Sequence, residues 1–353
     1  PPSLLFAGPE GSGKELMALR LAARLNCDAA RRNGGEEPAG LFGDEAKGGA
    51  ACGAGGRCRS CATTGTLEHP DLHLIYPVPS GDWEKELPVV IESRREDFFA
   101  YGEFGARARS VGIDLVRHVI ETLAKHPFEG RRSVVVVFEA HLATTEAQNA
   151  LLKILEEPAA SAVIVLVTEY PDRLLPTILS RLYEVRFNPL SSETVADVLE
   201  RFRSVEPGEA RRIAAIAQGN LRRAVKLLDE RFLGLWRDAT GLIRLVVDGK
   251  SRELLAEAEG LARRYSREEA RELLEEASLI FGLVMRRRDA PLDEAGEGAL
   301  REAIGAERLE RAAERDAPAD IRKIAEAAEA LRRNADIELT MAQLLLDLTG
   351  AWY

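Results

Sequence analysis

The sequence lacks the long apolar runs of a membrane protein, it has no excess of positive charge, and it has few aromatic side chains. No run of 18 or more apolar residues occurs in it, although a membrane-spanning helix needs about 20. No signal peptide opens the chain either, so we expect a cytoplasmic protein without a membrane partner. The formal charge is −10, and aromatic residues make up 6% of the chain. These values exclude a bulk attraction to nucleic acid, although a local basic face stays compatible with them.

A starting methionine is also missing, because the chain begins at Pro1, almost on its first predicted strand. We therefore expect that a segment upstream of Pro1 has been removed or left out. The length of 353 residues predicts two or three domains with enough apolar residues for real cores.

Beyond residue 61 the sequence has no cysteine, and the first 61 residues contain all four: Cys27, Cys52, Cys58 and Cys61. Close cysteines in a cytosolic protein suggest a metal site rather than a disulfide. The two-residue gap between Cys58 and Cys61 lets both thiolates reach one tetrahedral zinc, which the other two would complete. Because Cys27 is remote, His69 or His73 is an alternative fourth ligand. A redox pair or unlinked thiols is the competing interpretation, and a closed zinc site would be structural.

Near the start of the chain, an apolar run, a glycine-dense turn and an amphipathic segment predict a strand, a loop and a helix. The loop matches the phosphate-binding motif Gly-x-x-x-x-Gly-Lys, with Gly8, Gly11, Gly13 and Lys14 as the candidate nucleotide-binding residues. Glycines let backbone N–H groups converge on phosphate, and Lys14 supplies a point charge. Glu15 stands where the motif has the Ser or Thr that ligates magnesium. The loop is therefore predicted to be inherited, with ATP binding left open.

A second departure follows a run of four valines at residues 134–137, which predicts a strand buried on both faces. A working Walker B strand ends in Asp-Glu, where the Asp holds magnesium and the Glu polarises the attacking water. Here Phe138 occupies the Asp position, and Glu139 follows it. A phenylalanine does not bind a cation, while Glu139 is either that catalytic glutamate or an ordinary carboxylate at the end of a strand.

The remaining pattern alternates strands and helices as far as residue 187, which predicts a parallel sheet layered with helices. We expect further strands at 72–76, 163–168 and 183–187 and further helices at 113–125 and 145–157. Residues 77–110 contain three prolines and a Glu/Arg-rich part, and we interpret them as an irregular insertion.

At this point the chain resembles a known family. The phosphate loop, the cysteine cluster, the segment Asn-Ala-Leu-Leu-Lys-Ile-Leu-Glu-Glu-Pro at 149–158 and Thr-Ile-Leu-Ser-Arg at 177–181 carry the resemblance. Together they are similar to the clamp-loader subunits of bacterial DNA polymerase III, of the AAA+ class, and within them to delta-prime subunits. The likeness covers nearly the whole chain, because residues 218–224 and 331–335 resemble the lid and the collar of that family.

The resemblance implies roles for individual residues. Arg181 would be an arginine finger that points at the ATP of a neighbouring subunit, although Leu182 replaces the usual Cys after it. Arg222 aligns with the sensor-2 arginine, and Glu169 falls at the sensor-1 place, where Thr or Asn is usual. Because Glu169, Glu15 and Phe138 all depart from groups that handle Mg·ATP, we expect no ATPase activity from this chain.

The expected fold is therefore α/β, with an AAA+ parallel-sheet domain at 1–188 that includes a zinc module at 27–61. A small helical lid at 189–232 and a C-terminal helical collar for oligomerisation at 233–353 would follow. The apolar stripes of the collar, such as Leu273, Ala277 and Ile280, are expected to form a core.

The resemblance implies a non-hydrolysing subunit of the DNA polymerase III holoenzyme, with structural zinc as its cofactor. Its partners would be gamma/tau and delta subunits in a hetero-pentamer, the sliding clamp, and primed DNA through the assembly. Two alternatives stay open: an ATP-hydrolysing motor subunit of the same loader, and a zinc-dependent nucleic-acid-binding module. The acidic balance of the chain speaks against the second alternative.

Overall fold

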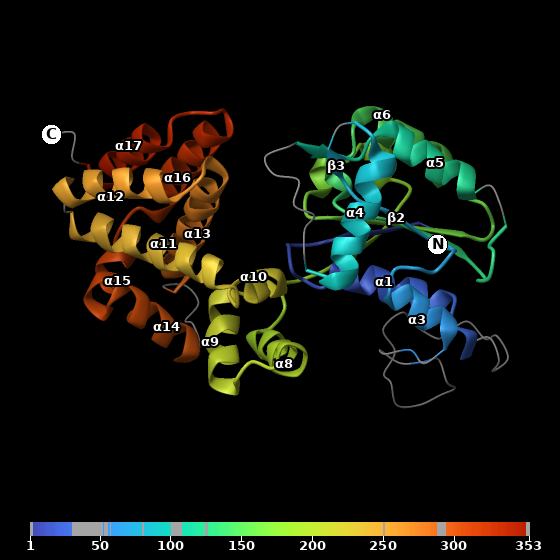
Figure 1. The fold of residues 1–353 in the computed structure, drawn as a ribbon, viewed down its shortest axis with the longest axis horizontal. Helices are drawn as coiled ribbons and strands as arrows, with labels where there is room; N and C mark the ends of the chain where they lie inside the picture. The colour runs from blue at the N-terminus through green and yellow to red at the C-terminus, as the bar shows by residue number, and fades with distance from the viewer. Residues whose placement is uncertain are drawn as a thin grey trace. The chain divides into compact units, whose positions relative to one another are not determined.

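The computed structural model of the chain consists of two compact units, Pro1–Leu190 and Ser191–Tyr353 (Figure 1). Each unit is described by itself below. The described residues are 3–29, 52, 56, 58–79, 81–99, 108–123, 126–249, 251–287 and 294–350. Most of the segment predicted as the zinc module, and residues 100–107 of the predicted insertion, lie outside this set. Among the described residues, no helix combines the length and the apolar character needed to cross a membrane.

The first unit contains the predicted five-stranded parallel sheet, which confirms the expected fold class. Its strands lie in the order β2-β5-β6-β1-β7. Their bounds are Leu72–Ile75 for β2, Ser133–Val137 for β5, Ala162–Thr168 for β6, Ser3–Ala7 for β1 and Tyr183–Arg186 for β7. Every pairing is parallel, so the carboxyl ends of all five strands meet at one edge. The phosphate loop follows β1, one strand in from the end of the sheet.

Helices cover both faces of this sheet (Figure 1), which explains the unbroken apolar runs in β1, β5 and β6. Alternate side chains of these strands pack into two cores, one with α5 and α6 and the other with α1 and α4. The helices are α1 Lys14–Leu25, α3 Arg59–Gly65, α4 Trp83–Glu96, α5 Ile113–Leu123, η1 Ala140–Leu142, α6 Thr145–Glu156, η2 Pro171–Arg173 and α7 Pro176–Leu179. The strands and helices expected from the pattern are thus confirmed.

The interpretation of residues 77–110 as irregular is wrong for much of that segment. It contains the helix α4, with Pro88 inside it, and a short antiparallel pair of β3, Val78–Pro79, with β4, Arg109–Ser110. Proline removes one hydrogen bond from a helix interior, and three prolines therefore suggested a break. Tertiary packing outweighs that loss, because Val90 of α4 is buried and Trp83 and Leu87 pack against both cores of the sheet.

The second unit is helical throughout its described length. Its helices are α8 Ser192–Arg203, α9 Pro207–Ala217, α10 Leu221–Lys226, α11 Glu230–Asp248, α12 Ser251–Arg264, α13 Arg267–Arg286, α14 Glu294–Ile304, α15 Ala306–Ala313, α16 Ala317–Arg332 and α17 Ile337–Thr349. The predicted apolar stripes are core, since Leu273, Ala277 and Ile280 are almost fully buried. The division of this unit into a lid and a collar stays a prediction.

A buried ion pair joins the short helix α10 to α13 within the second unit. The guanidinium of Arg223 lies 2.7 Å from a carboxylate oxygen of Glu276, and both side chains are less than a tenth exposed. Arg223 also donates to the carbonyl oxygen of Ile216, at the end of α9. Three helices therefore depend on one arginine. Removing one partner of such a pair leaves an uncompensated buried charge.

We predict that Arg223→Ala lowers the free energy of unfolding of the second unit by about 3–5 kcal/mol. Arg212→Ala is the matched control, because Arg212 pairs with Glu302 at the same 2.7 Å but on the surface. An exposed pair contributes about 0–1 kcal/mol. Urea unfolding of the full chain, followed by its helical circular dichroism, measures both variants. Equal losses for the two substitutions would contradict the prediction.

Candidate functional site

The phosphate loop joins β1 to α1 at the carboxyl edge of the sheet. Gly11 and Gly13 have φ angles of 67° and 82°, in the left-handed region that glycine enters without strain. Gly8 lies so close to β7 that a Cβ there would stand 2.4 Å from the carbonyl oxygen of Phe187. Gly13 caps α1 without any side-chain hydrogen bond. The loop thus keeps the backbone form in which the first N–H groups of a helix can receive an anion.

The ammonium group of Lys14 points back into the chain's own loop. Its Nζ donates to the carbonyl oxygen of Pro9 at 2.8 Å and lies 3.7 Å from a carboxylate oxygen of Glu169. The side chain is only 4% exposed, and a buried ammonium needs such partners. A carboxylate and a carbonyl of this chain therefore stand where the motif would bring phosphate oxygens.

The carboxylate of Glu15 is neutralised by an arginine that the sequence did not single out. Arg94, from α4, lies 3.2 Å from a carboxylate oxygen of Glu15, and its side chain is 1% exposed. The same guanidinium donates to the carbonyl oxygen of Phe98 and lies over the rings of Tyr76 and Phe98. Its place in the motif alone suggested that Glu15 would repel a triphosphate. The structure instead pairs its charge with Arg94.

The residue at the Walker B position completes a packed aromatic pair. Phe138 is fully buried and stacks on Tyr76, with the ring centroids 4.3 Å apart and the planes 2° from parallel. The next residue, Glu139, takes a left-handed backbone conformation and lies 3.7 Å from Arg109. Burial raises its carboxyl pKa, while Arg109 opposes that shift. The position that holds magnesium in a working site is thus occupied by an apolar ring.

The sensor-1 place, just after β6, contains a hydrogen-bonded turn that presents Glu169. The hydroxyl of Thr168 accepts from the N–H of Tyr170 at 3.1 Å and lies 3.2 Å from Nδ1 of His141. Burial raises the pKa of Glu169 to about 7, with Lys14 acting against that rise. Burial, together with Arg173 and Lys14, lowers the pKa of His141 to about 4. His141 is therefore neutral near pH 7, whereas Glu169 titrates there.

Arg181 lies directly after the short helix α7, on the surface of the first unit. Its guanidinium donates to the carbonyl oxygen of Thr177 at 2.8 Å and to the hydroxyl of Ser180 at 3.3 Å. It also lies 2.8 Å from a carboxylate oxygen of Glu156, at the end of α6, with both side chains more than a third exposed. Arg181 is therefore accessible and oriented, and its ion pair with Glu156 is exposed to solvent.

Sequence reasoning missed Gln148, which connects α6 to the segment that leads to Arg181. Its amide nitrogen donates to the carbonyl oxygens of Ala143 and Arg173, and its amide oxygen accepts from the N–H of Leu175 at 2.8 Å. The side chain is buried. A polar residue on the apolar side of an amphipathic helix was the signal that could have identified it.

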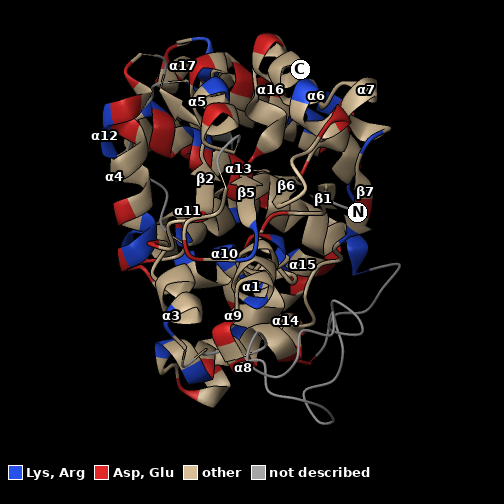
Figure 2. Cartoon of the chain, turned by 90° about the vertical axis from the view of Figure 1, so that its right-hand side faces the viewer, with Lys and Arg blue, Asp and Glu red and all other residues tan. Residues whose placement is uncertain are grey.

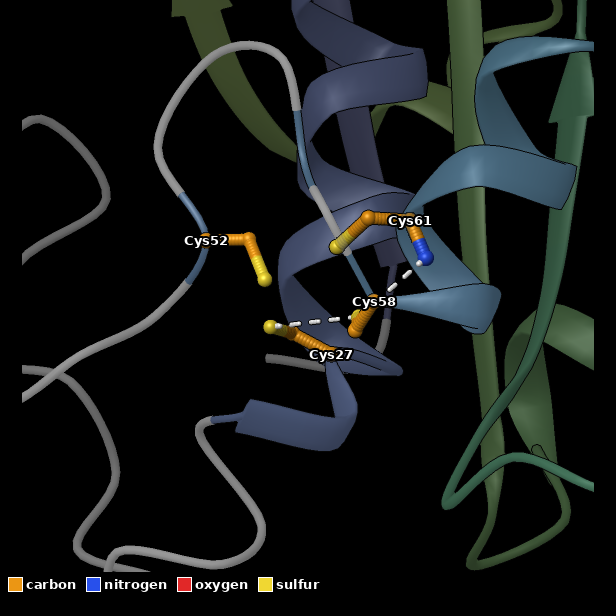
Figure 3. Close-up of side chains that lie close together, drawn as sticks. All are labelled: Cys27, Cys52, Cys58 and Cys61. Carbon is orange, nitrogen blue, oxygen red and sulfur yellow. Dashed lines mark hydrogen bonds between the residues drawn. The ribbon is translucent and has the colours of Figure 1, made fainter.

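The four cysteines come together in space. Their sulfur atoms all lie within 4.8 Å of one another, and in Figure 3 the four side chains point toward a common centre. The sulfurs of Cys27 and Cys58 are 3.9 Å apart, and none of the four cysteines forms a disulfide. Sulfurs bound at about 2.3 Å to one tetrahedral zinc lie about 3.8 Å apart, whereas a disulfide needs about 2 Å. The donor set and its spacing therefore fit one tetrahedral thiolate-binding metal.

The neighbourhood of this cluster bears on the alternative fourth ligands. Both ring nitrogens of His69 make hydrogen bonds, Nε2 with the hydroxyl of Ser60 and Nδ1 with the N–H of Asp71. His73 lies in β2 and is not among the clustered groups. Gly56, which sequence reasoning missed, packs against Cys61: a Cβ at this glycine would stand 2.1 Å from the Cβ of Cys61 and 2.9 Å from its sulfur. The geometry thus favours Cys27 as the fourth ligand.

Arg222 lies in α10 of the second unit, and its side chain is buried. Because the phosphate loop belongs to the first unit, the role of Arg222 at that loop stays a prediction. Acidic and basic side chains both occur along α8 and α12 of this unit (Figure 2). A nucleic-acid-binding helix instead concentrates basic residues on one face. These two helices therefore do not favour the interpretation as a nucleic-acid-binding module.

Comparison with known proteins gives one family match. A family model described as "DNA polymerase III, delta subunit" matches residues 1–191. The chain is 31% identical to the DNA polymerase III subunit delta' of Bacillus subtilis over 223 residues, which cover 63% of this chain and 52% of that protein. It is also 31% identical to the subunit delta' of Pseudomonas aeruginosa over 206 residues, 58% of this chain and 49% of that protein.

A further relative carries a different subunit name. The DNA polymerase III subunit gamma/tau of Mycobacterium tuberculosis is 30% identical over 199 residues, which cover 56% of this chain and 26% of that protein. The chain spans about half the length of the delta' relatives it matches.

Proposed function

Since this chain belongs to the DNA polymerase III delta-subunit family, as a clamp-loader subunit of the delta-prime type, we propose that it acts as a stator, a fixed AAA+ subunit that hydrolyses no ATP itself. It takes a place in a hetero-pentamer with gamma/tau and delta subunits. There Arg181 reaches the ATP bound by a neighbour, while the assembly loads the sliding clamp on primed DNA. The observation that carries this proposal is a contrast: the charges at the chain's own nucleotide site are paired internally, and Arg181 is exposed.

The contacts of Arg181 suit a finger that must leave its resting place. A planar guanidinium offers five N–H donors and matches phosphate oxygens better than an ammonium does. The carbonyl of Thr177 and the hydroxyl of Ser180 orient the group from its own helix. Its pair with Glu156 is solvated, and such pairs contribute about 0–1 kcal/mol. Exchanging Glu156 for a phosphate therefore costs little.

We predict that the isolated chain has no measurable magnesium-dependent ATPase activity. Phe138 offers no oxygen to a cation, and Arg94 already pairs with the carboxylate at the other magnesium position. Phosphate release by the purified chain measures this, with Lys14→Ala as the control for a contaminating ATPase. Steady turnover that Lys14→Ala abolishes would favour the alternative, an ATP-hydrolysing motor subunit, which the gamma/tau relatives keep open.

We further propose that Cys27, Cys52, Cys58 and Cys61 bind one structural zinc. A zinc held by four thiolates has no open position, so it cross-links the end of α1 to α3 rather than acting on a substrate. Burial raises the pKa of the Cys61 thiol, and the neighbouring Cys58 and Cys27 thiols add to the rise. Binding therefore releases protons and is weaker in acid.

We predict one zinc per chain, and its loss in Cys27→Ser. Atomic emission measures the zinc content of the purified chain. Ser60→Ala is the matched control, because it removes the hydroxyl that binds the His69 ring and changes no cysteine. It should keep the zinc. Full zinc occupancy in Cys27→Ser would remove Cys27 from the ligand set. The sheet core should survive zinc removal, because its apolar packing does not include the cysteines.

We predict that Arg181→Ala leaves the chain folded and the complex assembled, but slows ATP hydrolysis by the complete loader. Arginine fingers contribute about 10³–10⁵ in rate in GTPases, and several ATP sites of a loader share the total. Arg181→Lys restores little, because its ammonium lacks the planar fork. Clamp- and DNA-stimulated ATPase of reconstituted complexes is the measurement.

Arg186→Ala is the matched control for this experiment, because Arg186 is another exposed arginine of the first unit that pairs with a glutamate, Glu184. It should keep the wild-type rate. A wild-type rate with Arg181→Ala as well would mean that Arg181 is not a finger, and that this chain only supports the assembly.

A further inference from the structure

The phosphate loop of this chain is intact in its backbone, although the groups that handle magnesium are replaced. Gly11 and Gly13 have the left-handed angles that the loop requires, and no side chain caps the helix behind it. Ser12, within the loop, is 4% exposed, and its hydroxyl has no hydrogen-bond partner among the described residues.

The anion that lies beside the lysine of this loop is a carboxylate of the chain itself. The carboxylate of Glu169 lies 3.7 Å from the ammonium of Lys14, at the carboxyl edge where β6 ends beside β1. Thr168 fixes the turn that presents Glu169, through its hydrogen bond with the N–H of Tyr170. Two further carboxylates at this edge have arginine partners, Arg94 for Glu15 and Arg109 for Glu139.

We propose that the phosphate loop is a competent oxyanion site held shut by Glu169, whose carboxylate substitutes for a phosphate on Lys14. The ligand class is a tetrahedral oxyanion, either free or as the terminal phosphate of a nucleotide. Binding needs no magnesium, because the magnesium position is filled by the ring of Phe138. The inference rests on the proposed function only in that this loop does not turn over ATP.

Charge decides whether the site is open. With Glu169 ionised, an incoming dianion meets a carboxylate that already neutralises Lys14, so it is repelled. With Glu169 protonated, the ammonium no longer faces an ionised carboxylate at that position, and its hydrogen bond to the neutral carbonyl of Pro9 is readily exchanged. The acidic neighbours Glu10, Glu139 and Glu15 raise the pKa of Glu169 after burial, and Lys14 opposes them. His141 stays neutral across this range, because its pKa is lowered to about 4.

The sign of the pH dependence follows. Because the pKa of Glu169 is raised to about 7, its protonated fraction grows from about 3% near pH 8.5 to about 97% near pH 5.5. Affinity for an oxyanion should therefore rise about thirtyfold over this range. Sulfate is the appropriate probe, since its own charge does not change between these pH values. Calorimetric titration of the full chain measures it.

The variant Glu169→Gln keeps the shape of the side chain and removes its charge. Near pH 8.5 it should bind sulfate about thirtyfold more tightly than the wild type, and its affinity should not depend on pH. Adding Lys14→Ala to it should abolish the gain. Glu139→Gln is the matched control, because it neutralises a neighbouring carboxylate that pairs with Arg109 rather than Lys14. Glu169→Asn provides a second variant in case the glutamine variant folds poorly.

Titration with ADP in the presence of a chelator distinguishes the two sources of the anion. Tighter binding of ADP than of sulfate by Glu169→Gln assigns the site to nucleotides, and equal binding assigns it to small oxyanions. Sulfate affinity that is the same in wild type and Glu169→Gln, or an equal gain in Glu139→Gln, would overturn the proposal. Because these measurements do not involve Arg181, they fail or succeed independently of the proposed role in the loader.

Discussion

A charge taken out of water must meet an opposite charge or a set of hydrogen bonds, and the carboxyl edge of the sheet satisfies this requirement entirely from within the chain. In a working nucleotide site, Mg·ATP supplies the opposite charges. Here Glu169 forms an ion pair with Lys14, Arg94 with Glu15 and Arg109 with Glu139. These three pairs supply opposite charges from the chain itself to the buried charged groups at this edge.

The order in which the elements were recognisable from the sequence reflects how local their signals are. The valine run of β5 and the glycines of the phosphate loop can each be recognised from a few consecutive residues, and the structure contains both as expected. The cysteine cluster was predicted from a spacing, and the four sulfurs do meet. Arg94 could not be predicted, because its partner Glu15 is about 80 residues away in sequence and its helix contains Pro88. Local propensity argued against that helix, and tertiary packing outweighed it.

Other residues escaped for the same physical reason. Gln148 and Arg223 are buried polar side chains on helices, and each binds a group distant in the chain that the sequence does not identify. Gly56 matters because of what would touch its missing Cβ, and no sequence pattern contains that information. The departures from the motif at Phe138 and Glu169 were visible in the sequence. The residues that pack against or pair with them were not. Sequence reasoning therefore identified which groups were lost, while the structure identifies what replaced them.

Under the proposed function, the different exposure of two cations would let a subunit act at a neighbour's ATP site while its own site hydrolyses none. Lys14 is buried and lies beside the carboxylate of Glu169, so its charge is paired inside the first unit. Arg181 lies on the surface of the same unit, oriented by its own helix and paired with a solvated carboxylate that a stronger anion can displace. The contacts of Gln148, Thr177 and Glu156 described above involve none of the residues that form ion pairs at the phosphate loop. Lys14 and Arg181 therefore belong to separate sets of contacts, which is what the proposed stator role requires.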